Sequence, residues 1–333
     1  MAGDNLLVGS MTGELVALDI MDGSRLWSAQ IEEEAPSGGL GCAPSSQSVA
    51  IYGSPAVGGD LIYVGGYNGK IYAFALGREE PRWIYPREGT IGASIVGGLT
   101  VLEGRVYFGS SDGMVYALDA EDGFKDWDVA VGDKIWSTLT IDDDTLFVGS
   151  FDNKLHVLDT ADGSQKWEFE TEGAIVASPL VDDRTVYIGS FDRHLYALDA
   201  GDGNKKWKFM GENWFWTTPL IHNDTVYAAN LDGKVYALDA GTGNKLVEFD
   251  LASPISSSPV LVGDLVIVAT EGGKIYSLDT NDNRKEMMVN LEEEVHAPLA
   301  ASRDKVYIHT LEDTVYELDV VSGARRSFEL NSK

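Results

Sequence analysis

The strongest constraint on the fold of this chain is a segment that recurs every 40 residues. Residues 106–119 read VYFGSSDGMVYALD. Closely similar segments follow at the same spacing, at 146–159, 186–199, 226–239, 266–279 and 306–319, and two upstream copies begin at Leu6 and Ile62. A fixed period of this length indicates one supersecondary unit repeated along the chain. The sequence therefore predicts eight copies of that unit.

Each unit contains four short segments with the composition of β-strands. In one copy they are 178–181, 186–190, 195–199 and 205–209, separated by turns rich in Asp and Gly. The second segment alternates β-branched, aromatic and small residues, as a half-buried strand does. Four antiparallel strands per repeat are typical of a propeller blade. We predict an all-β fold, an eight-bladed β-propeller of four-stranded antiparallel blades, with residues 1–333 forming a single domain.

The repeat spacing is broken in two places. A loop insertion at about 31–50 is rich in Gly, Pro and Ser and contains the single cysteine, Cys42, and a smaller insertion lies at 91–99. Loops on a rigid scaffold often carry function. The chain enters its first copy at the second strand. We therefore expect upstream residues to have been removed and the blade with Trp27 to have three strands, its inner position empty or filled by the insertion.

A motif surrounds the turn between the third and fourth strands. Its pattern is Ala, any residue, Asp, two of any kind, Asp or Thr, Gly, three of any kind, then Trp. It ends in Trp27, Trp127, Trp167 and Trp207, with Val157 in the Ala position of the third of these, while blade two keeps only Ala73 and Trp83. In the last three copies the Trp position holds Val247, Met287 and Ser327. Asp and Gly suit the turn, and a Trp can bury its flat surface at a blade junction, so we expect Trp127, Trp167 and Trp207 to be buried.

This motif resembles the tryptophan-docking motif of PQQ-like repeat (quinoprotein-type) β-propellers. That superfamily includes quinoprotein alcohol dehydrogenases and BamB-type outer-membrane assembly lipoproteins. This chain, as one domain without additions, is closest in size to the second group. The resemblance implies a non-enzymatic, exported scaffold or sensor domain that binds a protein or small ligand on one face. It also implies a periplasmic or extracellular location, and the sequence leaves a cytoplasmic one open.

The alternative within the superfamily is an oxidoreductase that uses pyrroloquinoline quinone and Ca²⁺. The resemblance to such enzymes would imply a vicinal disulfide, formed by two adjacent cysteines, over the quinone. This chain has one cysteine and cannot form it. The five histidines show no metal-ligand spacing. Acidic runs such as 142–144 fall in expected turns. We therefore expect no catalytic residue, no metal site and no cofactor.

Charge narrows the choice of partner. The formal net charge is −28, which disfavours nucleic acid because phosphate binding depends on Lys and Arg. No apolar run is long enough to span a membrane, and no signal peptide is visible, although an anchor could have been removed.

Aromatic residues occur in the loops that open on one face of a propeller. These loops join strands two and three, or one blade to the next, and none of their aromatics occupies the docking position. With two flanking polar residues, they form the predicted binding face: Tyr67, Trp136, Phe151, Phe191, Arg193, His194, Trp214 and Trp216. Such a patch suits recognition of a peptide or a carbohydrate. The alternative is that these side chains fill the mouth of the central channel as apolar packing.

Overall fold

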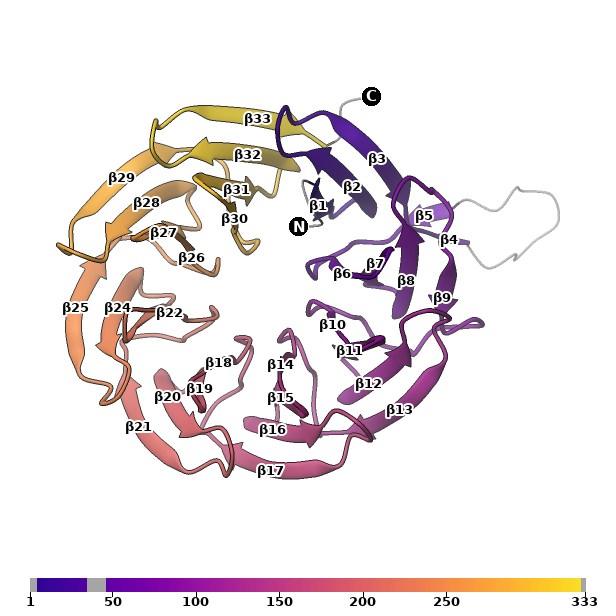
Figure 1. Ribbon diagram of the computed structural model, residues 1–333, viewed down its shortest axis with the longest axis horizontal. Coiled ribbons are helices and arrows are strands. Elements are labelled where there is room, and N and C mark those ends of the chain that lie inside the picture. The colour runs from indigo at the N-terminus through magenta and orange to yellow at the C-terminus, as the bar shows by residue number, and fades with distance from the viewer. Residues whose placement is uncertain (1–4, 35–45, 331–333) are drawn as a thin grey trace. The chain divides into compact units, whose positions relative to one another are not determined.

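The computed structural model describes residues 5–34 and 46–330, and regular structure there consists of β-strands (Figure 1). The described residues form no helix that is long and apolar enough to cross a membrane. The chain divides into two compact units, residues 1–141 with 160–164 and residues 142–159 with 165–333.

Blades are numbered here in chain order. Blade one consists of β1 (Asn5–Gly9), β2 (Glu14–Asp19) and β3 (Arg25–Gln30). Blade two consists of β6 (Ala56–Gly58), β7 (Leu61–Gly66), β8 (Lys70–Ala75) and β9 (Trp83–Tyr85), and blade three of β10 (Thr100–Leu102), β11 (Arg105–Gly109), β12 (Met114–Asp119) and β13 (Lys125–Ala130).

Five further blades follow. Blade four consists of β14 (Thr140–Asp142), β15 (Thr145–Gly149), β16 (Lys154–Asp159) and β17 (Gln165–Glu170), and blade five of β18 (Leu180–Asp182), β19 (Thr185–Gly189), β20 (His194–Asp199) and β21 (Lys205–Met210). Blade six consists of β22 (Leu220–His222), β23 (Thr225–Ala229), β24 (Lys234–Asp239) and β25 (Lys245–Asp250). Blade seven consists of β26 (Val260–Val262), β27 (Leu265–Ala269), β28 (Lys274–Asp279) and β29 (Lys285–Asn290), and blade eight of β30 (Ala300–Ser302), β31 (Lys305–His309), β32 (Thr314–Asp319) and β33 (Arg325–Glu329).

These sheets confirm the predicted eight-bladed β-propeller. Seven sheets in the described residues have four strands, and blade one has three, as expected for the blade that contains Trp27. Within each blade the strands pair in sequence order, because short turns connect antiparallel neighbours.

The insertion after blade one is more ordered at its ends than its composition predicted. β4 (Glu32–Glu34) pairs with β5 (Ser46–Ser48) as a separate two-stranded sheet, so the described ends of the insertion add no strand to β1. Beyond β5 the chain returns to blade one, where the amide of Ile51 donates to the Ser10 carbonyl at 3.1 Å. Residues 35–45, including Cys42, lie outside the described residues.

Trp207 shows how the docking motif works. Ala197 of β20 lies opposite Trp207 of β21, and the register shifts directly after this pair. The Trp207 indole N–H then donates to the Ala240 carbonyl in the next blade at 2.8 Å. Gly243 of the same turn has a positive φ of 71°, and a Cβ there would lie 2.6 Å from the indole. Glycine therefore suits both the turn and the ring that lies against it.

The docking contact recurs between other blades. Trp83, Trp127 and Trp167 donate to the carbonyls of Ala120, Thr160 and Ala200 at 3.1, 3.2 and 3.2 Å. Burial is confirmed for Trp207, which is 8% exposed, whereas Trp127 and Trp167 are only half-buried. The core between neighbouring blades includes the docked indole: around Trp207 it contains Leu195 of blade five with Val226 and Leu238 of blade six.

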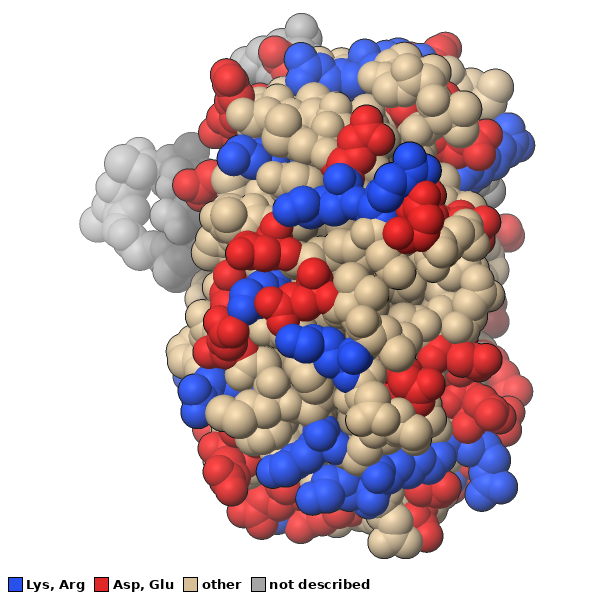
Figure 2. Space-filling view, turned by 90° about the vertical axis from the view of Figure 1, so that its left-hand side faces the viewer, with Lys and Arg blue, Asp and Glu red and all other residues tan. Residues whose placement is uncertain are grey.

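The last strand of each blade is an edge strand and carries many charges. On the side of the molecule shown in Figure 2, Lys and Arg lie among Asp and Glu although the chain is strongly acidic. Lys245 of β25 pairs with Glu248 at 2.6 Å, and Glu248 also contacts Lys234 at 3.1 Å. Charged side chains on an edge strand oppose its pairing with a strand of another chain. The charges on these outer strands therefore favour blades to which no further strand is added.

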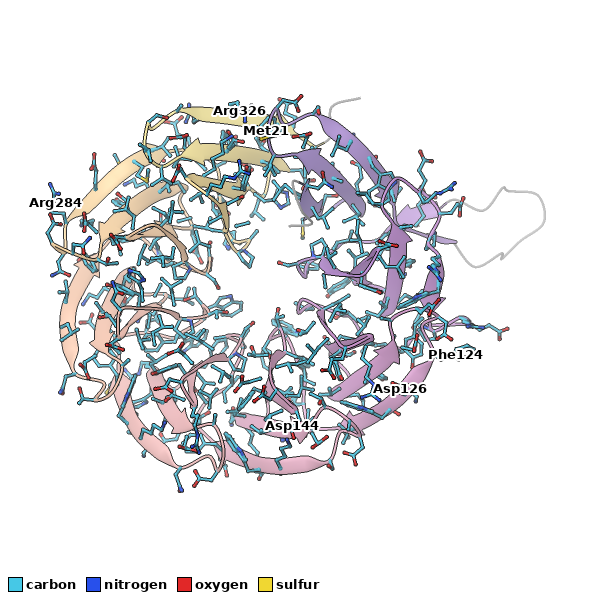
Figure 3. All side chains as sticks on the ribbon, in the orientation of Figure 1. Met21, Phe124, Asp126, Asp144, Arg284 and Arg326 are labelled. Carbon is cyan, nitrogen blue, oxygen red and sulfur yellow. The ribbon has the colours of Figure 1, made fainter. Side chains whose placement is uncertain are left out.

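Blade eight departs from the motif. Glu317 takes the position that Ala holds in blade five, and its buried carboxylate accepts three hydrogen bonds from the Arg326 guanidinium, at 2.6, 2.8 and 3.0 Å. Lys305 adds an ion pair at 2.8 Å. Arg326 belongs to β33, the last strand of its blade (Figure 3). This charged triad replaces the Ala197–Trp207 pair of blade five.

His309 of blade eight is expected to make stability depend on pH. Burial lowers the pKa of His309, and nearby Asp313, 3.1 Å away, only partly opposes this. The unfolded chain therefore binds a proton that the folded chain resists, and stability should fall as pH drops below about 6.5. Replacing His309 by Ala, the residue at the equivalent position 269, should reduce that fall. Urea unfolding at pH 7.5 and pH 5.5 measures it; the exposed-site variant His296→Ala should keep the wild-type decline, and an unchanged decline in His309→Ala would contradict the assignment.

Candidate ligand-binding surface

Four aromatic side chains of the second unit form one contact group, called here the aromatic cluster: Phe151, Phe191, Trp214 and Trp216. The Phe191 and Trp214 rings are stacked, with centroids 4.5 Å apart and planes inclined by 10°. Trp216 is stacked on Phe191 at 5.4 Å and 19°, and Phe151 meets Phe191 edge-on at 6.3 Å. The structure therefore brings together half of the predicted binding face.

Two loops position the cluster. Phe191 follows β19, and its amide donates to the Ala174 carbonyl at 2.9 Å. Trp214 and Trp216 lie in the connection between β21 and β22, on either side of Phe215, which is buried beneath Gly189. A Cβ at Gly189 would lie 2.6 Å from the Cβ of Phe215. Burial of the central aromatic residue thus fixes the segment, and the two indoles project from it beside Phe191.

The cluster is not fully covered by protein. Trp214 is 43% exposed, while Phe151, Phe191 and Trp216 are half-buried. Aromatic stacking contributes about 0.5–1.5 kcal/mol per pair beyond the burial of area. The stacked Phe191 ring therefore holds Trp214 in place while part of the indole stays open to solvent.

The predicted residues of the first unit have their own surroundings. Tyr67 is 54% exposed and lies 5.3 Å from Tyr52, ring centre to ring centre. The Trp136 indole N–H donates to the Ser111 hydroxyl at 3.2 Å, and Trp136 is half-buried. That Tyr67 and Trp136 belong to the same binding face as the aromatic cluster stays a prediction.

The two predicted polar residues differ in their environment. Arg193 is exposed and has a φ of 72°. His194 begins β20, its backbone amide donates to Asp192 Oδ1 at 2.9 Å, and its Nδ1 lies 3.3 Å from the same oxygen. His194 therefore contributes to the structure of the turn, whereas the Arg193 side chain extends from it.

Sequence reasoning missed the role of the aspartates in these turns. Asp192 Oδ2 accepts hydrogen bonds from the Tyr196 hydroxyl at 2.6 Å and from the Glu172 amide at 3.1 Å. The same hydrogen bond between side chains four residues apart joins Asp112 to Tyr116, Asp152 to His156 and Asp232 to Tyr236, at 2.7, 2.8 and 2.8 Å. The recurring Asp-x-x-x-Tyr spacing is a signal that could have identified it.

The pKa shifts of Asp192 and Tyr196 agree with this structural role. Burial acts to raise the pKa of Asp192, but hydrogen bonds from Tyr196 and two backbone amides outweigh it and lower the pKa overall. Burial and the neighbouring carboxylate both raise the pKa of Tyr196. The pair thus consists of a carboxylate and a protonated phenol at neutral pH.

The carboxylate oxygens of these turns do not fit a site for calcium and a quinone. Their carboxylates already accept hydrogen bonds from phenol, imidazole or backbone groups, and they belong to successive blades. A calcium site needs six to eight oxygen ligands gathered around one point. Over the described parts of the chain, no group of three or more His, Cys, Asp or Glu is placed to hold a metal ion.

Comparison with known proteins agrees with the repeat and the fold. The chain is a PQQ-like repeat β-propeller that resembles BamB. It belongs to the family described as "Beta-alanine-activating enzyme, beta-propeller", whose model matches residues 103–333 and thus more than half of the chain. Residues 1–129 match the model described as "Outer membrane protein assembly factor BamB".

Solved structures share the architecture at low sequence identity. BamB from Moraxella catarrhalis is 20% identical, with a TM-score of 0.76 over 93% of this chain and 92% of that one. The computationally designed Ika8 protein is 17% identical, with a TM-score of 0.78 over 99% of this chain and 94% of that one. No curated protein matches the sequence significantly. At these identities the likeness establishes the fold.

Proposed function

We propose that this propeller is a non-enzymatic binding module that holds a protein or small ligand at the aromatic cluster. The observation that carries the proposal is Trp214, 43% exposed and stacked on Phe191. An immobilised aromatic side chain offers contact area at little entropic cost, since its rotamer is already fixed. Trp is also enriched among residues that dominate binding energy.

One of the two family matches supports the same kind of role. The first blades match a model described as an outer membrane protein assembly factor, and the family description names the propeller of an enzyme. We infer that this chain acts as a scaffold or sensor domain in the periplasm or outside the cell. Its acidity favours partners other than nucleic acid.

Removal of the Trp214 indole should weaken ligand binding about tenfold or more, because a central aromatic anchor contributes about 2 kcal/mol or more. The measurement is binding of wild-type protein and Trp214→Ala to oligosaccharide and peptide arrays, followed by titration calorimetry with the strongest hit. Leu246→Ala, which removes a side chain 56% exposed on β25, should bind like the wild type. Equal affinity of wild type and Trp214→Ala for the strongest hit would contradict the proposed site.

The oxidoreductase alternative has a direct test. Purified protein is mixed with pyrroloquinoline quinone, CaCl₂, an alcohol and a redox dye. We expect no dye reduction above a protein-free control. Dye reduction that depends on the protein would replace the binding module by an enzyme.

A further inference from the structure

Arg193 occupies a turn position that the other blades fill with residues suited to positive φ. The equivalent residues are Gly13, Gly69, Gly113, Asn153, Gly233, Gly273 and Asp313, and all have φ between 58° and 84°. Glycine adopts this region freely, and Asn and Asp reach it more readily than other residues do. Arg193 has the same φ, 72°, without either advantage.

The space around the equivalent position in blades six and seven also favours glycine. A Cβ on Gly233 would lie 2.7 Å from the Ser253 carbonyl oxygen, and one on Gly273 would lie 2.2 Å from that of Glu293. A left-handed conformation at a residue such as Arg costs roughly 1–2 kcal/mol. Arg193 thus adopts a conformation that glycine would reach with less strain.

No contact within the described structure offsets this cost. The Arg193 backbone takes part in the turn, its amide donating to Ser190 and its carbonyl accepting from Gly211. Its guanidinium, by contrast, has no hydrogen-bond or ion-pair partner among residues 5–34 and 46–330. Strained residues that the fold does not need are a recurring feature of ligand sites.

Arg193 lies beside the aromatic cluster. It is two residues from Phe191, so their Cα atoms are at most about 7 Å apart. Its carbonyl, which accepts from the Gly211 amide at 2.9 Å, fixes the start of the loop that carries Trp214 and Trp216. An unpaired cation and a partly open indole therefore belong to one small area of an otherwise acidic chain.

We propose that Arg193 and Trp214 form a subsite for a six-membered sugar ring that bears a carboxylate, as in a uronic-acid oligosaccharide. The sugar would lie on the open indole, whose electron-rich face attracts C–H groups. Its carboxylate would accept paired hydrogen bonds from the guanidinium. Physiological salt screens charges beyond about 8 Å, so the carboxylates that oppose this contact are nearby ones such as that of Asp192, the preceding residue, rather than the distant acidic surface. The inference rests on the proposed function and specifies its ligand.

The decisive variant is Arg193→Gly, because glycine suits the turn and so the protein should melt at or above the wild-type temperature. Titration calorimetry with trigalacturonate should show an affinity loss of tenfold or more. Binding of maltotriose, a neutral trisaccharide, should change less than twofold. Asn153→Gly, the matched change in blade four, should leave both affinities unchanged, and Arg193→Lys should restore only part of the loss, since an ammonium cannot bind a carboxylate in paired fashion.

Three outcomes would overturn the inference. They are absence of trigalacturonate binding to the wild type at millimolar concentration, equal trigalacturonate affinity in wild type and Arg193→Gly, and Arg193-dependent binding of indole-3-acetate in place of the sugar. The proposed function fails separately: Trp214→Ala would then bind the strongest array hit as the wild type does. Loss of that hit in Trp214→Ala, with no effect of Arg193→Gly on trigalacturonate, would reject the acidic sugar and leave the binding module standing.

Discussion

Trp207→Ala is expected to lower the free energy of unfolding by about 3–5 kcal/mol, the usual cost of truncating a large buried aromatic residue. The indole is 8% exposed, packs with both blades five and six, and donates to the Ala240 carbonyl. Its loss would leave a cavity at the junction and an unpaired acceptor. Urea unfolding followed by circular dichroism measures the change without relying on tryptophan fluorescence.

The matched control for Trp207 is Met210→Ala. Met210 belongs to the same strand, β21, and is 55% exposed, so its truncation should change stability by less than about 0.5 kcal/mol. An unchanged midpoint in Trp207→Ala would show that the docking contact does not stabilise the junction.

Removing both cations of the blade-eight triad, in Lys305→Ala/Arg326→Ala, should cost about 3 kcal/mol. Breaking a buried ion pair is strongly destabilising because a buried charge loses its compensation. The Glu317 side chain is only 6% exposed, and these two residues are its ion-pair partners. Chemical denaturation at pH 7 measures the loss.

A third substitution separates the ion pairs from ordinary packing. Adding Glu317→Ala removes the uncompensated carboxylate and restores the residue found at position 237 of blade six, so much of the lost stability should return. If the triple variant were less stable than the double variant, the triad would act through packing of its long side chains rather than through charge.

The repeat made the architecture predictable because each copy carries the same local information. Alternating residues specify the strands, Asp and Gly specify the turns, and the copy that begins at Leu6 enters at its second strand, as the three-stranded blade confirms. The β4–β5 pairing was not predictable, since it joins segments separated by residues 35–45 and depends on long-range contact. That all eight blades form one domain stays a prediction.

The candidate site was predictable as a set of positions but not as a geometry. Loop position identified Phe191, Trp214 and Trp216. The stacking that leaves Trp214 partly open, by contrast, depends on burial of Phe215, which lies between the two tryptophans in the sequence. His194 was assigned to the binding face, yet its contacts with Asp192 are those of a turn residue. Comparison of equivalent positions could have singled out Arg193, because five of the eight copies carry glycine there.

The docking tryptophans also determine where the propeller opens most easily. The Trp207 indole joins blade five to Ala240 and Gly243 of blade six. Val247 and Met287, which occupy the Trp position in blades six and seven, have no side-chain N–H to donate. In repeat proteins, stability is approximately a sum of terms from each unit and each contact between neighbours. Weaker neighbour terms allow sub-global unfolding at a cost below that of the whole chain. Within residues 165–333 we therefore expect the junctions that follow blades six and seven to open at the lowest cost, and the junction between blades five and six, which Trp207 docks, to open later.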